Sequence, residues 1–357
     1  MFLILSVPQE KSKYLFPALI ILLIIVLLSA IAFGAVAITL PEMFSAIQHF
    51  FQGLNPANIH EGVFLQIRLP RVLLCAITGA VLAVSGVLMQ GLFRNPIVEP
   101  GLLGTSAGAA FGASVVFVLS VNLSVEIKNI TGPLLVPLFA FGGGLLATYL
   151  VYTLAKNSKR VPVPALLLIG IAINAIGLSG TGFMSYIARD PQARSITFWN
   201  LGTFSGASWM QVFIVATVAA IVFIIALRLS KHLNALVLGE EEAGYLGVNA
   251  EQLKRRLLLL TTAMVSVVTA FVGVISFMGL IVPHIMRLLM GSDNKKLLPA
   301  SMLVGAILLT LADMGARLLL APAEIPIGII TSLVGAPVFI ILLKRSNILQ
   351  GKGGLYD

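Results

Sequence analysis

The feature that most constrains this chain is a series of long apolar segments, separated by short polar loops, along almost its whole length. About ten of them approach the roughly 20 residues that a helix needs to cross a bilayer. Because a spanning backbone must satisfy its own hydrogen bonds, the series predicts an all-α, polytopic membrane protein with about ten transmembrane helices. The segments lie near residues 15–37, 71–92, 102–121, 132–154, 163–187, 210–229, 257–275, 277–290, 298–320 and 326–343.

Composition and charge support the same class. The chain is 58% hydrophobic and only 10% charged, whereas soluble proteins carry about 25% charged residues. A net charge of +9 is compatible with nucleic acid binding, but the basic residues are dispersed between apolar segments and form no continuous basic face. We therefore expect a lipid bilayer around the chain and no nucleic acid partner.

The distribution of Lys and Arg indicates an orientation. If all ten segments cross, the basic loops fall on one side, which the positive-inside rule assigns to the cytoplasm together with both termini. The run 15–37 is too long for a cleaved signal peptide and is expected to be the first span. The basic loops contain Lys156, Lys159 and Arg160; Arg228, Lys231, Lys254, Arg255 and Arg256; Lys295 and Lys296; Lys344 and Arg345.

The segment 257–290 has an unusual length. It is too long for one span and short for two, and Gly273, Gly279 and Pro283 interrupt it. Two short spans and a broken or steeply re-entrant helix are both consistent with this pattern.

No motif indicates chemistry performed by the chain itself. The sequence contains no phosphate-binding loop, no His-Glu-x-x-His and no Cys/His cluster with zinc spacing, so we expect no catalytic residue and no metal site. Cys75 is expected to be a buried apolar residue. Asp313 and Arg317, spaced i and i+4, favour a structural salt bridge, with a proton relay as the alternative. Energy must come from a gradient or from another subunit.

The segment 239–248 is the longest charged stretch inside the chain. Its glycines delimit a short helical turn, and Glu240, Glu241 and Glu242 lie at the end of that turn where the helix dipole favours acids. A solvated loop helix and a docking surface both fit this pattern.

Several separate motifs occur in a fixed order along the chain. They are Arg68-Leu-Pro-Arg71, Ser85-Gly86 to Gln90-Gly91, Asn95-Pro96 with Pro100-Gly101, the 239–247 loop, Gly279-Leu-Ile-Val-Pro283-His284 with Arg287, and Ala321-Pro-Ala-Glu-Ile-Pro-Ile-Gly328 with Leu333-Val-Gly-Ala-Pro337. Together they resemble the FecCD permease family, the membrane subunits of type II ABC importers for iron-siderophores, haem and cobalamin. The resemblance covers about residues 15–345.

The resemblance implies a type II ABC importer permease fold as one transmembrane domain, residues 1–357, in a bacterial inner membrane. It implies a homodimer bound by two cytoplasmic ABC ATPase subunits and by a substrate-binding protein. ATP and Mg would be held by the ATPase, and no cofactor by this chain. The cytoplasmic loop at about 230–256 would couple to the ATPase through Glu240, Glu241, Glu242, Tyr245, Leu246 and Gly247.

The resemblance also implies roles for three further groups of residues. Relatives receive acids of the binding protein on arginines, which correspond here to Arg68, Arg71 and Arg317; internal pairing is the alternative. The translocation pathway would be lined by Asn174, Ser179, Thr181, Met184, Thr331 and Ser332, although helix packing explains each of them equally well. A structural motif comprises Asn95, Pro96, Pro100, Gly101, Pro283 and His284, and for His284 a structural or gating role is favoured over haem ligation.

The motifs look most like the haem-importing branch of the family. We therefore expect haem or another iron chelate as cargo, moved by alternating access at the homodimer axis, with ferric siderophores and cobalamin as alternatives. Two hypotheses come from other classes. An ion-gradient carrier would transport without an ATPase subunit, and an intramembrane enzyme would need a nucleophile–base pair or metal constellation, for which the sequence offers no candidate.

Overall fold

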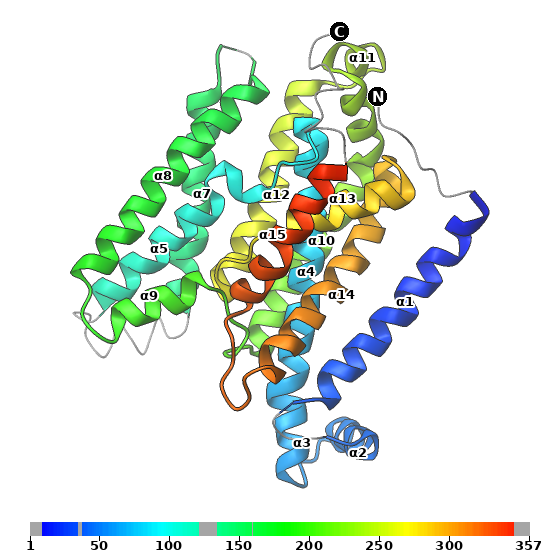
Figure 1. The fold of residues 1–357 in the computed structure, drawn as a ribbon, viewed down its shortest axis with the longest axis vertical. Coiled ribbons are helices and arrows are strands. Elements are labelled where there is room, and N and C mark those ends of the chain that lie inside the picture. The colour runs from blue at the N-terminus through cyan, green and yellow to red at the C-terminus, as the bar shows by residue number, and fades with distance from the viewer. Residues whose placement is uncertain (1–8, 35–37, 121–133, 159, 346–357) are drawn as a thin grey trace.

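A computed structural model describes residues 9–34, 38–120, 134–158 and 160–345 of the chain (Figure 1). Within these ranges each predicted span forms a helix, and no strand occurs, so the all-α prediction is confirmed. Seven helical stretches are long and apolar enough to cross a membrane, and three apolar helices are shorter. The ten are α1 (Gln9–Ala32), α4 (Leu69–Phe93), α5 (Thr105–Leu119), α7 (Leu135–Ala155), α8 (Val163–Ile187), α10 (Trp209–Leu238), α12 (Ala250–Val272), α13 (Met278–Met290), α14 (Asn294–Leu318) and α15 (Ile327–Arg345).

Helix α4 forms the centre of the bundle, and α10, α12, α13 and α14 pack around it (Figure 1). In the span that contains α4, 83% of the most apolar window is buried. Glycines allow α4 to pack closely against its neighbours. Gly79 lies against Gly305 of α14 and Gly86 against Gly279 of α13, so that a Cβ at either α4 glycine would collide with the facing carbonyl. Helices in a membrane associate through such close backbone packing.

Helices α5, α7 and α8 form a second group beside this centre, with α9 (Gln192–Asn200) packed against α5 and α8 (Figure 1). Helices α8 and α15 expose large apolar side chains, among them Ile171 and Ile176 on α8 and Leu333 and Val334 on α15. Such faces require lipid or another subunit to cover them.

The segment 257–290 is broken into two helices. Helix α12 ends at Val272, α13 begins at Met278, and the connection contains two left-handed residues, Gly273 with φ +78° and Phe277 with φ +69°. The backbone N–H of Thr203 donates to the Val272 carbonyl at 2.9 Å, so this helix end is hydrogen-bonded to a neighbouring segment. The structure thus has the interruption that the sequence pattern indicated, with a separate helix on each side of it.

Short helices cover one end of the bundle: α2 (Leu40–Phe51), α3 (Ile59–Val63) and the π-helical turn η1 (Phe64–Arg68), which runs into α4. In η1 the N–H of Leu69 donates to the carbonyl of Phe64, five residues earlier. The indole N–H of Trp209, the first residue of α10, donates to the Leu65 carbonyl at 3.0 Å. The turn is therefore tied to a second helix.

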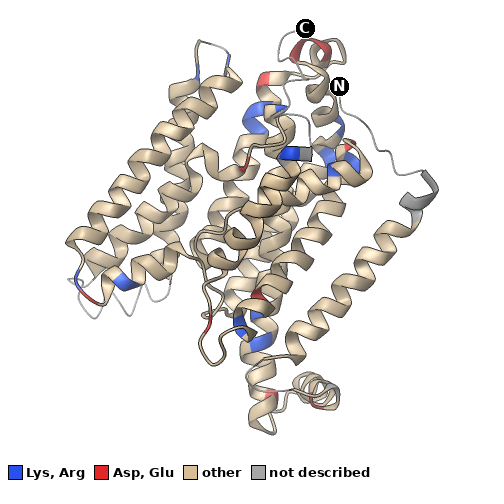
Figure 2. Cartoon of the chain, viewed as in Figure 1, with Lys and Arg blue, Asp and Glu red and all other residues tan. Residues whose placement is uncertain are grey.

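Charged residues gather near the two ends of the helices, while most of the bundle between them is uncharged (Figure 2). The basic loops predicted to be cytoplasmic lie at the end that carries α11 (Glu240–Tyr245), opposite to α2 and α3. Lys159 and the two chain termini lie outside the described residues.

Candidate functional site

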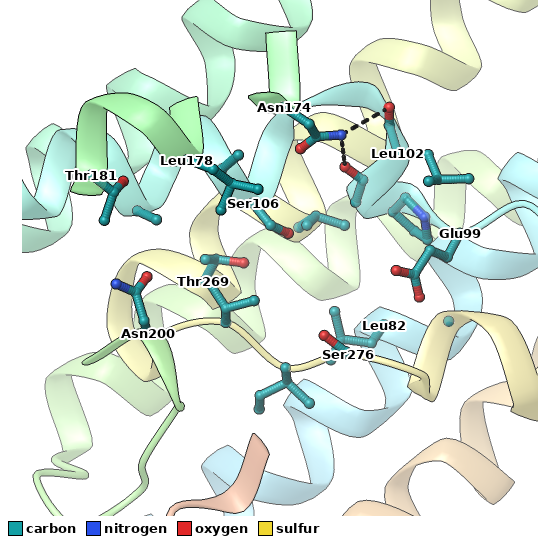
Figure 3. A pocket seen from close by; sticks show the side chains of 18 residues that line it. Leu82, Glu99, Leu102, Ser106, Asn174, Leu178, Thr181, Asn200, Thr269 and Ser276 are labelled. Atoms are coloured by element: carbon teal, nitrogen blue, oxygen red, sulfur yellow. Dashed lines mark hydrogen bonds between the residues drawn. The ribbon is translucent and has the colours of Figure 1, made fainter. Parts of the chain in front are cut away.

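A cavity of about 510 Å³ lies within the subunit, between α8 and the broken segment of α12 and α13 (Figure 3). Its walls also include η2 (Pro100–Leu103), α5 and the end of α9. The polar residues that line the cavity are Glu99, Ser106, Asn174, Thr181, Asn200, Thr269 and Ser276. They come from several separate elements and alternate with apolar side chains, so they offer scattered weak contacts.

Two of the predicted pathway residues line this cavity. Asn174 donates from Nδ2 to the carbonyls of Gly101 and Leu102, at 3.0 and 3.2 Å (Figure 3). Thr181 donates to the carbonyl of Gly177, one turn earlier in α8, at 2.9 Å. Asn174 therefore fastens α8 to η2, while its amide remains at the wall of the cavity.

The other predicted pathway residues lie elsewhere. Ser179 is exposed on α8, and Met184 and Ser332 are half-buried. Thr331 is buried in α15, and its hydroxyl donates to the Gly328 carbonyl at 3.3 Å. The structure brings together Asn174 and Thr181 but does not place these four at the cavity.

Sequence analysis did not single out Glu99 as a site residue. Its side chain points into the cavity (Figure 3) and lies near the backbone N–H of Phe277. Phe277 immediately precedes α13, so the Glu99 side chain lies near the start of that helix. The available signal was an isolated acid between Pro96 and Pro100 in an otherwise uncharged motif.

The three predicted docking arginines form a buried network where the start of α4 meets the end of α14. Arg71 donates to Asp313 at 2.9 Å and to Glu324 at 2.7 Å. The Asp313 carboxylate also lies 3.0 Å from Nε of Arg317, which confirms the predicted i, i+4 pair. Arg68, Arg71 and Arg317 are only 5%, 8% and 9% exposed.

Two of these arginines also bind the end of α1. Arg68 donates to the carbonyls of Ile31 and Ala32 at 2.6 and 3.0 Å, and Arg317 donates to that of Ala30 at 3.0 Å. The last carbonyls of a helix lack partners within it and favour a positive charge. The arginines thus join α1, α4 and α14. This agrees with the alternative that they pair within the subunit, and their docking role stays a prediction.

The segment 239–248, predicted to couple to an ATPase, contains the short helix α11, which confirms the predicted helical turn. Ala243 is buried and anchors it, whereas Tyr245 is 90% and Leu246 63% exposed. Gly247 has φ +78°, a left-handed conformation that ends the turn with little strain only for glycine. The helix therefore presents an aromatic and aliphatic tip, with the exposed acids Glu241 and Glu242 beside it.

Glu240 differs from its neighbours, because it forms an ion pair with Lys254 at 2.8 Å. The Lys254 side chain is 2% exposed. Sequence analysis treated Lys254 as one of several basic loop residues and missed this contact. A partial signal was the i, i+3 spacing of Glu251 and Lys254, which also pair, at 2.9 Å.

The motif residues 95–101 shape the connection between α4 and η2. Helix α4 ends with Arg94 in the left-handed conformation, and the N–H of Asn95 donates to the Gln90 carbonyl at 3.2 Å. Asn95 Oδ1 then accepts from the N–H of Ile97 at 3.0 Å. Pro100 and Gly101 begin η2, which carries both carbonyls that hold Asn174. These contacts agree with a structural role.

Pro283 and His284 lie in α13 and do not line the cavity. Pro283 has no N–H to donate to the Gly279 carbonyl, and it is against this carbonyl that Gly86 of α4 packs. His284 is half-buried. Among the described residues, no group of three or more His, Cys, Asp or Glu side chains is arranged to hold a metal ion.

Residues 21–345 match the FecCD transport family. The chain is 41% identical to the hemin transport system permease protein HmuU of Yersinia pestis over 95% of this chain and 98% of HmuU. It is 36% identical to the vitamin B12 import system permease protein BtuC of Klebsiella pneumoniae over 97% of both chains. The Fe(3+) dicitrate transport system permease protein FecD of Escherichia coli is 37% identical over 80% of this chain and 86% of FecD.

One solved structure is similar over nearly the whole chain. It is described as a metal-chelate type ABC transporter in an inward-facing conformation. The TM-score is 0.80 at 32% sequence identity, covering 94% of this chain and 99% of the other. The family match and this structural similarity therefore cover nearly the same part of the chain.

Proposed function

The chain belongs to the FecCD transport family and is the permease of a type II ABC importer, and from this we propose that it carries haem across a bacterial inner membrane into the cytoplasm. The observation that carries the choice of haem is the 41% identity to a hemin permease over almost the full length of both chains. Ferric siderophores and cobalamin are the alternatives, since dicitrate and vitamin B12 permeases match at 37% and 36% identity.

We propose that the chain, as one transmembrane domain over residues 1–357, forms a homodimer with α8 and α15 at its axis. The exposed apolar faces of these two helices support this arrangement. Each subunit would bind a cytoplasmic ABC ATPase, which holds ATP and Mg, and a substrate-binding protein would deliver cargo from outside. The basic loops at the α11 end support a cytoplasmic position for that end and for both termini.

We propose that the loop at about 230–256 couples the permease to its ATPase. The exposed Tyr245 and Leu246 support this, because an aromatic and aliphatic tip flanked by charge is typical of an interface centre. Glu241 and Glu242 would lie at the rim, and Gly247 shapes the tip. Glu240 would act mainly within the subunit, because its carboxylate is already paired with Lys254.

We propose that the cavity beside α8 forms the subunit's share of the translocation pathway, with Asn174 and Thr181 at its wall. Its scattered polar groups suit a conduit, because a lining that bound cargo tightly would not release it. Ser179, Met184, Thr331 and Ser332 are proposed to face the pathway at the dimer axis. ATP binding would close the ATPase subunits, and α8 and α15 would switch which side of the pathway is open.

We propose that the outer arginine network receives the binding protein. Glu324, whose side chain is 40% exposed, is its accessible member, while Arg68, Arg71 and Arg317 lie behind it. An acidic group of the binding protein would compete with Glu324 for Arg71, because a guanidinium binds carboxylates bidentately.

The test is reconstitution of the chain in liposomes with its ATPase and binding protein. Uptake of haem, a panel of ferric siderophores and cobalamin is measured with ATP, without ATP and without the ATPase. ATP-dependent uptake of haem alone would confirm the proposal. Uptake of another cargo would replace haem, whereas uptake that ignores ATP would favour an ion-gradient carrier.

A further inference from the structure

A buried ammonium group connects three cytoplasmic segments of the subunit. Nζ of Lys254 lies 2.8 Å from Glu240 Oε2, 2.9 Å from Glu251 Oε1 and 3.1 Å from the carbonyl oxygen of Val161. An ammonium has three N–H donors, and here each has an acceptor. We call these four residues the Lys254 junction.

The junction joins α11, which we propose to contact the ATPase, to the segment that leads into α8 at the cavity. Glu240 is the first residue of α11, while Glu251 and Lys254 lie near the start of α12. Val161 lies two residues before α8 begins. Glu251 Oε2 also accepts the N–H of Val161 at 3.0 Å, so both polar groups of this peptide segment are held.

The connection from the junction to α8 is short and stiff. Val161 is 2% exposed and cannot move without its neighbours. Pro162 and Pro164 follow, and proline rings fix φ, so little displacement can be absorbed by rotation there. Further along α8, Asn174 is hydrogen-bonded to the carbonyls of η2 at the cavity wall.

Burial explains why the junction should move as a unit. The Lys254 side chain is 2% exposed, whereas those of Glu240 and Glu251 are 38% and 30% exposed. Separating a buried charge from its partners is strongly unfavourable. A displacement of α11 therefore pulls on the ammonium, and the ammonium pulls on Val161.

We propose that Lys254 is a positioning residue that transmits displacement of α11 to the start of α8 and so to the cavity. This inference rests on the proposed coupling role of α11. It adds that the signal leaves α11 through one buried side chain of the same subunit.

The experiment measures ATP hydrolysis and uptake of haem, with ferric dicitrate and cobalamin in parallel, in the same proteoliposomes. Lys254→Met removes the ammonium but keeps an apolar chain of similar length. Lys254→Arg restores a cation, and Lys296→Met removes an exposed lysine of α14 as the matched control. Glu240→Gln weakens only the contact to α11 and leaves the contacts to Val161 and Glu251 in place. It keeps the inference testable if Lys254→Met prevents folding.

We expect Lys254→Met to lower uptake per ATP hydrolysed about tenfold while hydrolysis and ATPase binding persist. Glu240→Gln should lower the ratio less, Lys254→Arg should restore most of it, and Lys296→Met should match the wild type. An unchanged ratio in Lys254→Met and Glu240→Gln, with coupled uptake in the wild type, overturns this inference alone. Equal loss of uptake and hydrolysis also overturns it, because a purely structural role predicts that result. Absence of ATP-dependent uptake in the wild type overturns the proposed function and this inference with it.

Discussion

The outer arginine network and the coupling helix α11 were both predicted to be docking surfaces, yet they are built in opposite ways. At the outer end the three arginines are between 5% and 9% exposed and bind groups of their own subunit. At the other end Tyr245 is 90% exposed. In the sequence both regions appear as charged loops or helix ends, but only at α11 are the side chains exposed to solvent.

Charge placement explains the difference. A buried ion is tolerated only when paired, so the outer network necessarily holds α1, α4 and α14 together whether or not a partner binds there. At α11 one acid is paired with Lys254, and the exposed tip is apolar. In the arginine network, the residues predicted to dock are therefore the ones that hold the helices together, whereas at α11 the paired acid and the exposed tip are different residues.

The largest effect that separates the two regions is expected from Asp313→Asn. This change leaves the buried Arg71 and Arg317 without their shared carboxylate and should lower the free energy of unfolding by about 3 kcal/mol. Denaturant unfolding of the purified subunit measures it. Glu324→Gln is the control, because its side chain is 40% exposed and the loss should be about 1 kcal/mol or less. Equal losses would contradict the assignment of Asp313 as the centre of the network.

The second prediction concerns the tip of α11. Tyr245→Ala combined with Leu246→Ala should weaken binding of the ATPase by about 2 kcal/mol, or roughly 30-fold, and leave the unfolding free energy unchanged. Titration of the permease with its ATPase gives the affinity. Tyr186→Ala, which truncates a tyrosine that is 86% exposed on α8, should bind the ATPase normally. If the tip variant also binds normally, α11 is not the coupling element.

A smaller effect is expected from Arg68→Gln on the binding protein. Loss of the cation should weaken association by about 1 kcal/mol at low salt and by less at high salt, because ions screen the contact. The affinity of the loaded binding protein at two salt concentrations measures this. Arg189→Gln removes an exposed arginine from the loop between α8 and α9 and serves as comparison. A loss of stability with no change in affinity would assign Arg68 to the internal network alone.

The smallest effect is expected at Glu42 on α2. Its carboxylate accepts from the Thr39 N–H at 2.7 Å and from the Thr39 hydroxyl at 2.8 Å. These bonds, with a smaller contribution from His60, hold the pKa of Glu42 below its ordinary value. A lowered folded pKa gives stability that is present above the unfolded pKa and is lost as the pH falls through the folded pKa. The difference in unfolding midpoint between wild type and Glu42→Gln should shrink on acidification. A difference that persists in acid would show that charge is not its source.

Features that depend on nearby residues could be predicted from the sequence. The ten apolar helices, the turn at α11 and the Asp313–Arg317 pair follow from apolar length, glycine placement and i, i+4 spacing, and all are present. The break at Gly273 was one of the outcomes that the pattern allowed. Helices α2 and α9 lie in polar loops and are too short to resemble spans, so the span pattern gave no indication of them.

Features that depend on distant contacts could not be predicted. Arg71 and Asp313 are 242 residues apart, and nothing local to either indicates the other. The same holds for Lys254 and Val161, which are 93 residues apart. For the proposed pathway, the family resemblance singled out Asn174 and Thr181 on a helix that borders the cavity. Only packing decides that these two, and not Ser179, line the cavity beside α8.

The π-helical turn η1 is a position at which the chain can lose or gain a residue. A π-turn contains one residue more than an α-turn, so η1 sets the rotational phase of α3 relative to α4. Removing one residue there would convert the turn to a regular helix and rotate everything before it by about 100°. Helix α4 would keep its contacts with α10, α12, α13 and α14, while α2 and α3 would move to another part of the rim at that end of the bundle. Relatives that differ by one residue at this point would thus share an interior and differ in the surface they turn outward.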